Sequence, residues 1–291
     1  MDGLIEAITE VLNFSRSCMQ ITVHTPTVLV VSNLRAPLNQ ERINSHLVDS
    51  YWRVSVVDVT GSTQRDLVNS VRASNSVSGD VLTAEYQSQG KGRLDRTFEA
   101  APLSALLFSF FVQPKVNAER FSWLPLLAGL AVINALDKCC TFTNGNRAQL
   151  KWPNDILIGE SKVAGIIAES VDNKGVVIGI GLNVGMNLSE LPVDHATSLE
   201  LEGCSNCNRN ELLVAILQEF YTLMKRFEDS GSALKDEYVA RCATINSPIR
   251  VEYPSGEIID SFATGIDSTG ELILENGRKV SAGDVVHLRA R

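Results

Sequence analysis

The spacing of apolar residues changes near residue 246. Between residues 209 and 229, apolar side chains recur at three- and four-residue steps, which predicts a helix with one face against the core. After residue 246 the apolar positions alternate every second residue, and turn pairs such as Asn276-Gly277 separate five strand-like segments. Five short strands in about 45 residues predict a small barrel of SH3-like size.

Strand-like and helix-like patterns alternate before residue 209. The run after Trp52 alternates like a strand, and Ser62 or Thr63 then offers the N-cap of a short amphipathic helix. The dense apolar run at 122–138 predicts a buried helix, with Pro125 in its first turn, where a missing N–H costs little. We expect a further helix at 232–242, and strands at 80–86, 104–112, 149–158, 163–171 and 175–184.

The first 45 residues lack sustained periodicity. They mix short apolar pieces with turn formers, and only residues 2–14 suggest a short helix. This pattern is too irregular for a helix-turn-helix, whose two helices must pack at a fixed angle. We therefore expect a partly disordered N-terminal extension at 1–45, a large domain of strands and helices at 46–245 and the small barrel at 246–291.

Composition is that of a globular protein. Of 291 residues, 44% are hydrophobic and 21% charged, and no apolar run is long enough to span a bilayer. The acidic start lacks the positive charge of a secretory leader, so we expect a cytoplasmic protein without a membrane partner. The net charge of −8 disfavours nonspecific binding to nucleic acid.

The six cysteines are interpreted as reduced thiols, mostly buried. Cys204 and Cys207 form a single CxxC pair. As half of a zinc site, this pair would need a second cysteine or histidine pair at ligand spacing, and the sequence shows none. No resident metal is expected there.

Three segments carry residues suited to binding a ligand. In QSQGKGRLDRTF at 87–98, glycines permit close backbone approach and three cations add charge-assisted donors, although a solvated basic loop would look the same. In KWPND at 151–155, the last two residues suit a sugar hydroxyl or a magnesium ion, with a structural turn as the alternative. Lys162 precedes a small residue and a glycine on a buried strand and is suited to neutralising a developing negative charge, although such a lysine by itself is more often a surface residue.

Other nucleotide-binding and hydrolytic motifs do not fit. GIGLNVG at 179–185 has the wrong spacing for a dinucleotide fingerprint and does not open a helix. No P-loop spacing and no GxSxG nucleophile motif occur in the sequence.

Taken in order, GST, AEYQxxGKGRxxR, KWPND, KVAGIIAE and GIGLNV resemble the motif series of biotin protein ligases, also called holocarboxylase synthetases, over roughly residues 50–289. The resemblance implies an α+β fold, with a mixed sheet flanked by helices, shared with lipoate ligases and class II synthetases, and a C-terminal SH3-like barrel. It implies that biotin and Mg·ATP form biotinyl-5′-AMP and pyrophosphate. It further implies that the biotin then passes to a lysine of the biotin carboxyl carrier domain of an acyl-CoA or acetyl-CoA carboxylase, with release of AMP.

The resemblance also implies site residues. Lys162 and Arg93 would be catalytic, and Asp155 would hold magnesium. The expected biotin-binding residues are Ser62, Thr63, Gln87, Gly90, Lys91, Arg93, Lys162, Gly165 and Gly181. The expected nucleotide-binding residues are Arg93, Arg96, Phe98, Lys151, Asn154, Asp155, Lys162 and Asn183.

The chain departs from the family pattern at four positions. Lys91 replaces an arginine and loses bidentate geometry, Asp95 stands where glycine is usual, and Phe98 replaces tryptophan but keeps an aromatic face. Gln64 stands where asparagine is common. These changes bear on affinity and on the ordering of the loop. With no winged-helix pattern before the motifs, we expect a monofunctional enzyme that does not bind DNA.

Two other functions remain open. A lipoate or octanoate protein ligase shares the broader fold, but its usual arginine-rich and glycine-run signature is not evident, whereas KWPND is. A non-catalytic module that binds biotin or a partner would be favoured by loss of Lys162 or Arg93, and the sequence retains both.

Overall fold

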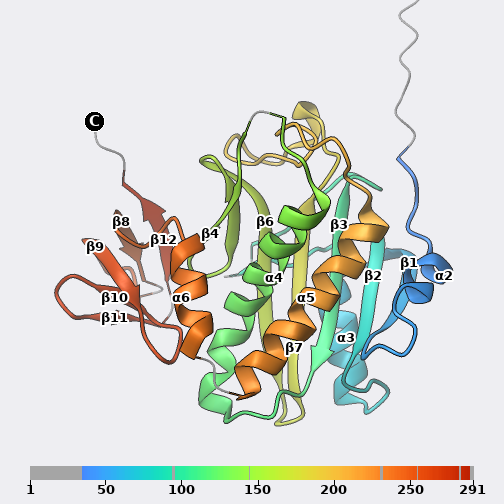
Figure 1. Cartoon of the computed structure of the whole chain (residues 1–291), viewed down its shortest axis with the longest axis horizontal. Helices are drawn as coiled ribbons and strands as arrows, with labels where there is room; N and C mark the ends of the chain where they lie inside the picture. The colour runs from blue at the N-terminus through green and yellow to red at the C-terminus, as the bar shows by residue number, and fades with distance from the viewer. Residues whose placement is uncertain are drawn as a thin grey trace, which may run out of the picture. The chain divides into compact units, whose positions relative to one another are not determined.

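The computed structural model describes residues 35–93, 96–143, 145–229, 232–253, 255–281 and 283–288. They lie in one compact unit that spans Arg35–Arg291. Its strands form two sheets, one of seven strands and one of five (Figure 1). The possible helix at 2–14 lies outside the described residues.

The seven-stranded sheet is mixed, as expected. Its first two strands pair in parallel and its other neighbours pair antiparallel. In spatial order the strands are β1 (Arg53–Thr60), β2 (Asp80–Gln87), β3 (Ala105–Val112), β7 (Gly175–Asn183), β6 (Ser161–Val171), β5 (Asp155–Ile158) and β4 (Ala148–Lys151).

Helices cover both faces of this sheet. On one face α4 (Leu124–Cys139) and α5 (Arg209–Asp229) pack together over the central strands, and on the other lies α3 (Thr63–Arg72) (Figure 1). Alternation along β3 explains both cores, since Phe110 belongs to the large cluster and Phe111 packs with Leu67 and Val71 of α3. The bounds of α5 are those that the apolar spacing predicts. The remaining helices are α2 (Gln40–Ser45), η1 (Ala118–Trp123), η2 (Leu188–Glu190) and α6 (Ser232–Arg241).

The single strand expected at 149–158 is wrong, because the structure forms β4 and β5 with a turn between them. Pro153 lacks the N–H that a continuing strand would need, and it follows a cis peptide bond. Trp152 is buried, and its indole donates to the carbonyl of Gly270 at 3.0 Å. This tryptophan therefore joins the large sheet to the C-terminal sheet.

The compact unit begins at Arg35, eleven residues before the expected start of the large domain at residue 46. Ile43 of α2 is completely buried, and the Asn44 side chain makes two hydrogen bonds with the backbone of Val54 in β1. Residues 35–45 thus pack with the seven-stranded sheet.

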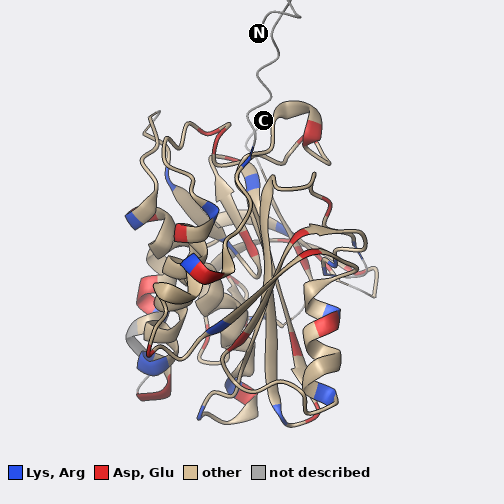
Figure 2. Cartoon of the chain, turned by 90° about the vertical axis from the view of Figure 1, so that its right-hand side faces the viewer, with Lys and Arg blue, Asp and Glu red and all other residues tan. Residues whose placement is uncertain are grey.

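The C-terminal sheet contains the five short strands that the period-two pattern predicts, all paired antiparallel. Within the described residues, no helix is both long and apolar enough to cross a membrane. Figure 2 shows acidic and basic residues interspersed along the helices and loops.

In spatial order the strands of the C-terminal sheet are β11 (Lys279–Val280), β10 (Leu272–Leu274), β9 (Ile258–Ile266), β8 (Ser247–Glu252) and β12 (Asp284–His287).

Candidate functional site

A cavity lies where the start of α3, the loop after β2 and the central strands meet. Its walls combine hydroxyl and amide groups, four cations and small or apolar residues. The lining residues are Ser62, Thr63, Gln64, Gln87, Lys91, Gly92, Arg93, Arg96, Thr97, Phe98, Phe108, Ser109, Asn154, Asp155, Lys162, Gly165, Ile166, Ile167, Gly179, Ile180, Gly181 and Asp284.

Polar groups at the start of α3 face this cavity. Gln87 accepts a hydrogen bond from the backbone N–H of Thr63 at 2.7 Å, and the hydroxyls of Thr63 and Ser109 lie 2.9 Å apart. Ser62 is the N-cap residue, yet its hydroxyl does not cap the helix, and its buried oxygen has no hydrogen-bond partner among the described residues. A buried hydroxyl without a partner is costly, so this oxygen is suited to a polar ligand.

Lys162, the second residue of β6, reaches into the cavity. Its ammonium lies 2.6 Å from a carboxylate oxygen of Asp155, and both side chains are partly exposed. A bulge between β5 and β6 interrupts the alternation of faces, so that Lys162 folds over Gly165. A Cβ on Gly165 would lie 3.1 Å from the lysine nitrogen, so a side chain at this position would crowd Lys162.

The loop after β2 forms a short hairpin with two arginines at the cavity. The N–H of Phe98 donates to the carbonyl of Gly90, and that of Gly92 donates to Arg96. Arg93 donates to the amide oxygen of Asn154 at 2.8 Å, and burial lowers the pKa of its guanidinium. Arg96 pairs with Asp284 of the C-terminal sheet. Asp95 lies outside the described residues, so its effect on the turn stays a prediction.

An aromatic ring covers a glycine on the central strand. A Cβ on Gly181 would lie 2.6 to 2.7 Å from three ring carbons of Phe98. Ordinary contacts between carbon atoms are about 3.5 to 4.0 Å, so the ring requires glycine here. The Phe98 ring and the Gly181 backbone form an apolar wall beside the polar groups of α3.

A second opening adjoins the cavity and shares Lys91, Arg93 and Asn154 with it. Trp152, Pro153, Glu119 and Gly270 also line this opening, which lies beside the contact of the large sheet with the C-terminal sheet. The two together offer a continuous site for an elongated ligand.

Three expected site residues do not line either opening: Gly90, Lys151 and Asn183. The Asn183 amide instead donates to the carbonyl of Thr197 at 2.9 Å. Burial lowers the pKa of Lys151. The sequence did not single out Ser109 or Asp284, although a serine in the otherwise apolar run of β3 is a visible signal.

Comparison with known proteins gives two domain matches. Residues 56–187 match the Biotin/lipoate A/B protein ligase family, and residues 244–288 match the Biotin protein ligase C terminal domain.

Individual relatives agree with these matches. A biotin--[acetyl-CoA-carboxylase] ligase of Mycobacterium tuberculosis is 37% identical over 88% of this chain and 98% of its own length. The bifunctional ligase/repressor BirA of Escherichia coli is 30% identical over 76% of this chain and 69% of its own length. The solved structure of an Aquifex aeolicus biotin protein ligase in complex with biotin and ATP has a TM-score of 0.69 and 28% identity, covering 81% of this chain and 99% of that one. Both domains and nearly the whole length of a relative are thus accounted for, and the chain belongs to the biotin protein ligase family.

Proposed function

We propose that this protein joins biotin to ATP, forming biotinyl-5′-AMP and pyrophosphate, and then transfers the biotin to a lysine of the biotin carboxyl carrier domain of acetyl-CoA carboxylase. The observation that carries the proposal is one cavity lined both by Lys162 and by the hydroxyl of Ser62, which has no hydrogen-bond partner among the described residues. The names of the relatives support the same reaction. A cytoplasmic location follows from the proposed substrates.

The polar groups at the start of α3 suit the uncharged ring of biotin. In this assignment Ser62, Thr63 and Gln87 hydrogen-bond the ring's polar atoms, while Phe98 and Gly181 enclose its apolar part. Such a site is mostly apolar with a few placed polar groups, as small-molecule sites generally are. Gly165 leaves room for the lysine that reaches the carboxylate end.

The first step needs positive charge more than it needs a base. The biotin carboxylate attacks the α-phosphorus of ATP, and negative charge gathers on the phosphate and carboxylate oxygens as pyrophosphate leaves. Lys162 is assigned to bridge these oxygens, and Arg93 to hold the phosphate side, because preorganised cations stabilise such charge without reorganising. In this assignment the nucleotide is bordered by Lys91, Arg96 and Asn154. Gly90 shapes the loop, since its carbonyl accepts the hydrogen bond from Phe98.

Magnesium fits the oxygen donors beside Lys162. The carboxylate of Asp155 is partly buried at the cavity, next to the amide of Asn154, and magnesium commonly takes one or two carboxylates together with substrate phosphates. Bound with ATP, the ion would supply positive charge at the phosphate oxygens. The same carboxylate lies 2.6 Å from the Lys162 ammonium, so in this assignment Asp155 positions the lysine as well as the ion.

In the second step, the carrier lysine attacks the mixed anhydride as a free amine, and AMP leaves. The described parts of the hairpin, 90–93 and 96–98, border the cavity, where Arg93 contacts Asn154 and Arg96 contacts Asp284. Closing this loop over the adenylate would keep water away until the carrier arrives.

The direct test is to incubate the full chain with biotin, Mg·ATP and a purified carrier domain, and to weigh the carrier by intact-mass spectrometry. We expect the mass of one biotinyl group, and no change when the target lysine of the carrier is replaced by arginine. Labelling with lipoate instead of biotin would establish the rival lipoate ligase. Binding of biotin without consumption of ATP would establish a binding module.

DNA binding is not part of the proposal, although the E. coli relative is named a bifunctional ligase/repressor. Residues 1–34 lie outside the described chain. A specific, salt-sensitive shift of an operator duplex by the full chain would overturn this part.

A further inference from the structure

Three thiols from distant parts of the sequence meet at one point. The sulfur atoms of Cys140, Cys204 and Cys207 all lie within 4.8 Å of one another. All three cysteines are free, and they are buried or partly buried. The CxxC pair recognised in the sequence thus gains a third thiol that its spacing does not reveal.

The backbone holds the three thiols in place. Cys140 is the C-cap of α4, and its N–H donates to Leu136 at 2.8 Å. The N–H of Cys204 donates to Leu199 at 2.9 Å, and Phe142 and Cys204 form an antiparallel bridge. Cys207 stands two residues before α5. The loop after α4 and the loop before α5 are therefore already paired around the sulfurs, so a ligand would find a largely preformed site.

We propose that Cys140, Cys204 and Cys207 bind a soft divalent cation, zinc being the physiological one, with a water or another ligand in the fourth position. Zinc bound to thiolates at about 2.3 Å in a tetrahedron places the sulfurs about 3.8 Å apart, which small side-chain rotations reach from the spacing present. A disulfide would join two of these thiols and leave the third unpaired. The site does not depend on the proposed ligase reaction.

Its place suggests a structural role for the metal. Cys204 lies near the end of the long loop that connects β7 to α5. The middle of this loop holds the backbone of Lys162. The N–H of Lys162 donates to His195 at 2.8 Å, and the N–H of Thr197 donates to the Lys162 carbonyl at 2.9 Å. A metal at the end of this loop would brace the backbone of the lysine.

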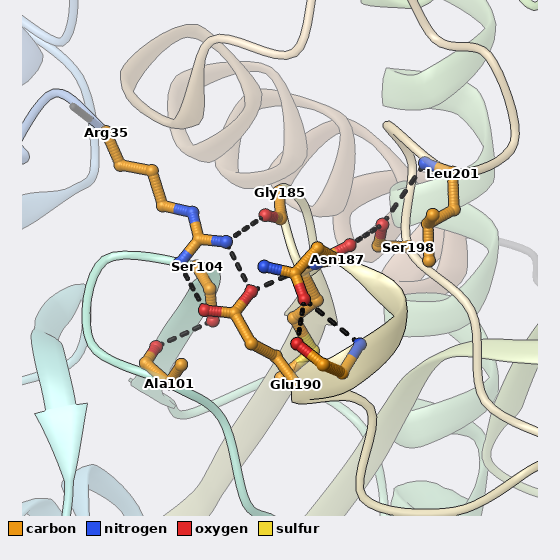
Figure 3. A network of polar contacts seen from close by, with 10 residues as sticks. Arg35, Ala101, Ser104, Gly185, Asn187, Glu190, Ser198 and Leu201 are labelled. Atoms are coloured by element: carbon orange, nitrogen blue, oxygen red, sulfur yellow. Dashed lines mark hydrogen bonds and ion pairs between the residues drawn. The ribbon is translucent and has the colours of Figure 1, made fainter. Parts of the chain in front are cut away.

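The beginning of the same loop is already fixed by a polar network. Figure 3 shows Arg35 reaching Glu190 and the carbonyl of Gly185, while the Ser198 hydroxyl donates to the carbonyl of Met186 at 2.7 Å. Arg35 thus anchors the first part of the loop to the segment before α2, and the Ser198 hydrogen bond ties two parts of the loop together. The thiol site would anchor the end of the loop to α4 and α5.

The test uses the full chain, purified with a reductant and without chelator, and measures metal by mass spectrometry of the elements. We expect ~1 zinc per chain. Replacing zinc by cobalt should give a thiolate-to-cobalt charge-transfer band and the intense visible bands of tetrahedral coordination. Cys204→Ser and Cys207→Ser should each lower metal content at least about tenfold, whereas Cys139→Ser, an adjacent thiol outside the cluster, should leave it unchanged.

Thermal unfolding separates loss of the site from failure to fold. Chelator should lower the Tm of the wild-type chain and of Cys139→Ser, and it should have no effect on a folded Cys207→Ser variant. The proposal is overturned if the reduced wild-type chain takes up neither zinc nor cobalt, or if Cys204→Ser and Cys207→Ser retain wild-type metal content. It is equally overturned if the non-reduced chain, isolated without chelator, carries a disulfide between two of the three cysteines.

Discussion

Replacing Lys162 by alanine should nearly abolish adenylate formation. The change removes the ammonium group that lies 2.6 Å from Asp155 and leaves that carboxylate beside two anionic reactants. Losing one preorganised donor costs about 10²- to 10³-fold in kcat in comparable sites. Two like charges about 4 Å apart repel by about 4 kcal/mol at an effective dielectric constant of 20, so the bare carboxylate adds to this loss. Because both side chains are partly exposed, solvent screens part of that repulsion.

The double variant Lys162→Ala/Asp155→Asn separates these two effects. It removes the cation and the stranded negative charge together, but also the magnesium ligand assigned to Asp155. At saturating magnesium it should therefore recover up to about tenfold relative to Lys162→Ala, equivalent to about 1.4 kcal/mol, and at limiting magnesium it should not recover. The measurement is single-turnover formation of biotinyl-5′-AMP, with Lys138→Ala as an exposed-lysine control. Adenylation by Lys162→Ala within threefold of wild type would refute the assignment. If adenylation were slow because the fold is lost, circular dichroism of the variant would show it.

Three further changes test other parts of the structure. Gly181→Ala places a methyl group 2.6 Å from the Phe98 ring, and overpacking of about 1 to 3 kcal/mol should weaken biotin binding about 5- to 150-fold by calorimetry; an unchanged Kd would remove the ring from the biotin wall. In the structure the guanidinium of Arg209 lies 2.6 Å from the buried carboxylate of Glu85. Arg209→Ala leaves that carboxylate without its cation and should lower the free energy of unfolding by about 3 to 5 kcal/mol in denaturant titrations. A loss below about 1 kcal/mol would contradict this. Burial lowers the pKa of His287, so the unfolded chain takes up its proton first and stability falls as the pH drops through about 6.5. His287→Gln should flatten that part of the stability curve, and identical curves would exclude this histidine as the cause.

The sequence predicted elements whose pattern is local. The bounds of α5 follow from apolar residues at helical steps, and the five C-terminal strands follow from period-two alternation between turn pairs. The single strand expected at 149–158 failed at Pro153, which lacks the N–H of a continuing strand and was a visible signal for a break. The burial of Trp152 against the C-terminal sheet is the part that nothing nearby in the sequence indicates. Helix α2 was missed because it buries one apolar residue, Ile43, which is too few for a period to show.

The candidate site was predictable where the motifs themselves line it. Ser62, Lys162 and Arg93 lie at one cavity as their motifs suggest. The contact of Arg96 with Asp284 and the convergence of Cys140 on the CxxC pair depend on tertiary packing between distant segments. Spacing along the chain carries no record of such encounters, so a single sequence could not reveal them.

The most direct test of the proposed function is the exchange of labelled pyrophosphate into ATP by the purified chain with magnesium, measured with biotin, with lipoate and with neither. Exchange reports reversible adenylate formation and needs no carrier protein. The proposed site predicts exchange that depends on biotin and is lost in Lys162→Ala. The proposal would be contradicted by exchange that lipoate supports and biotin does not. It would also be contradicted if the folded chain, supplied with magnesium and zinc, showed no exchange with biotin.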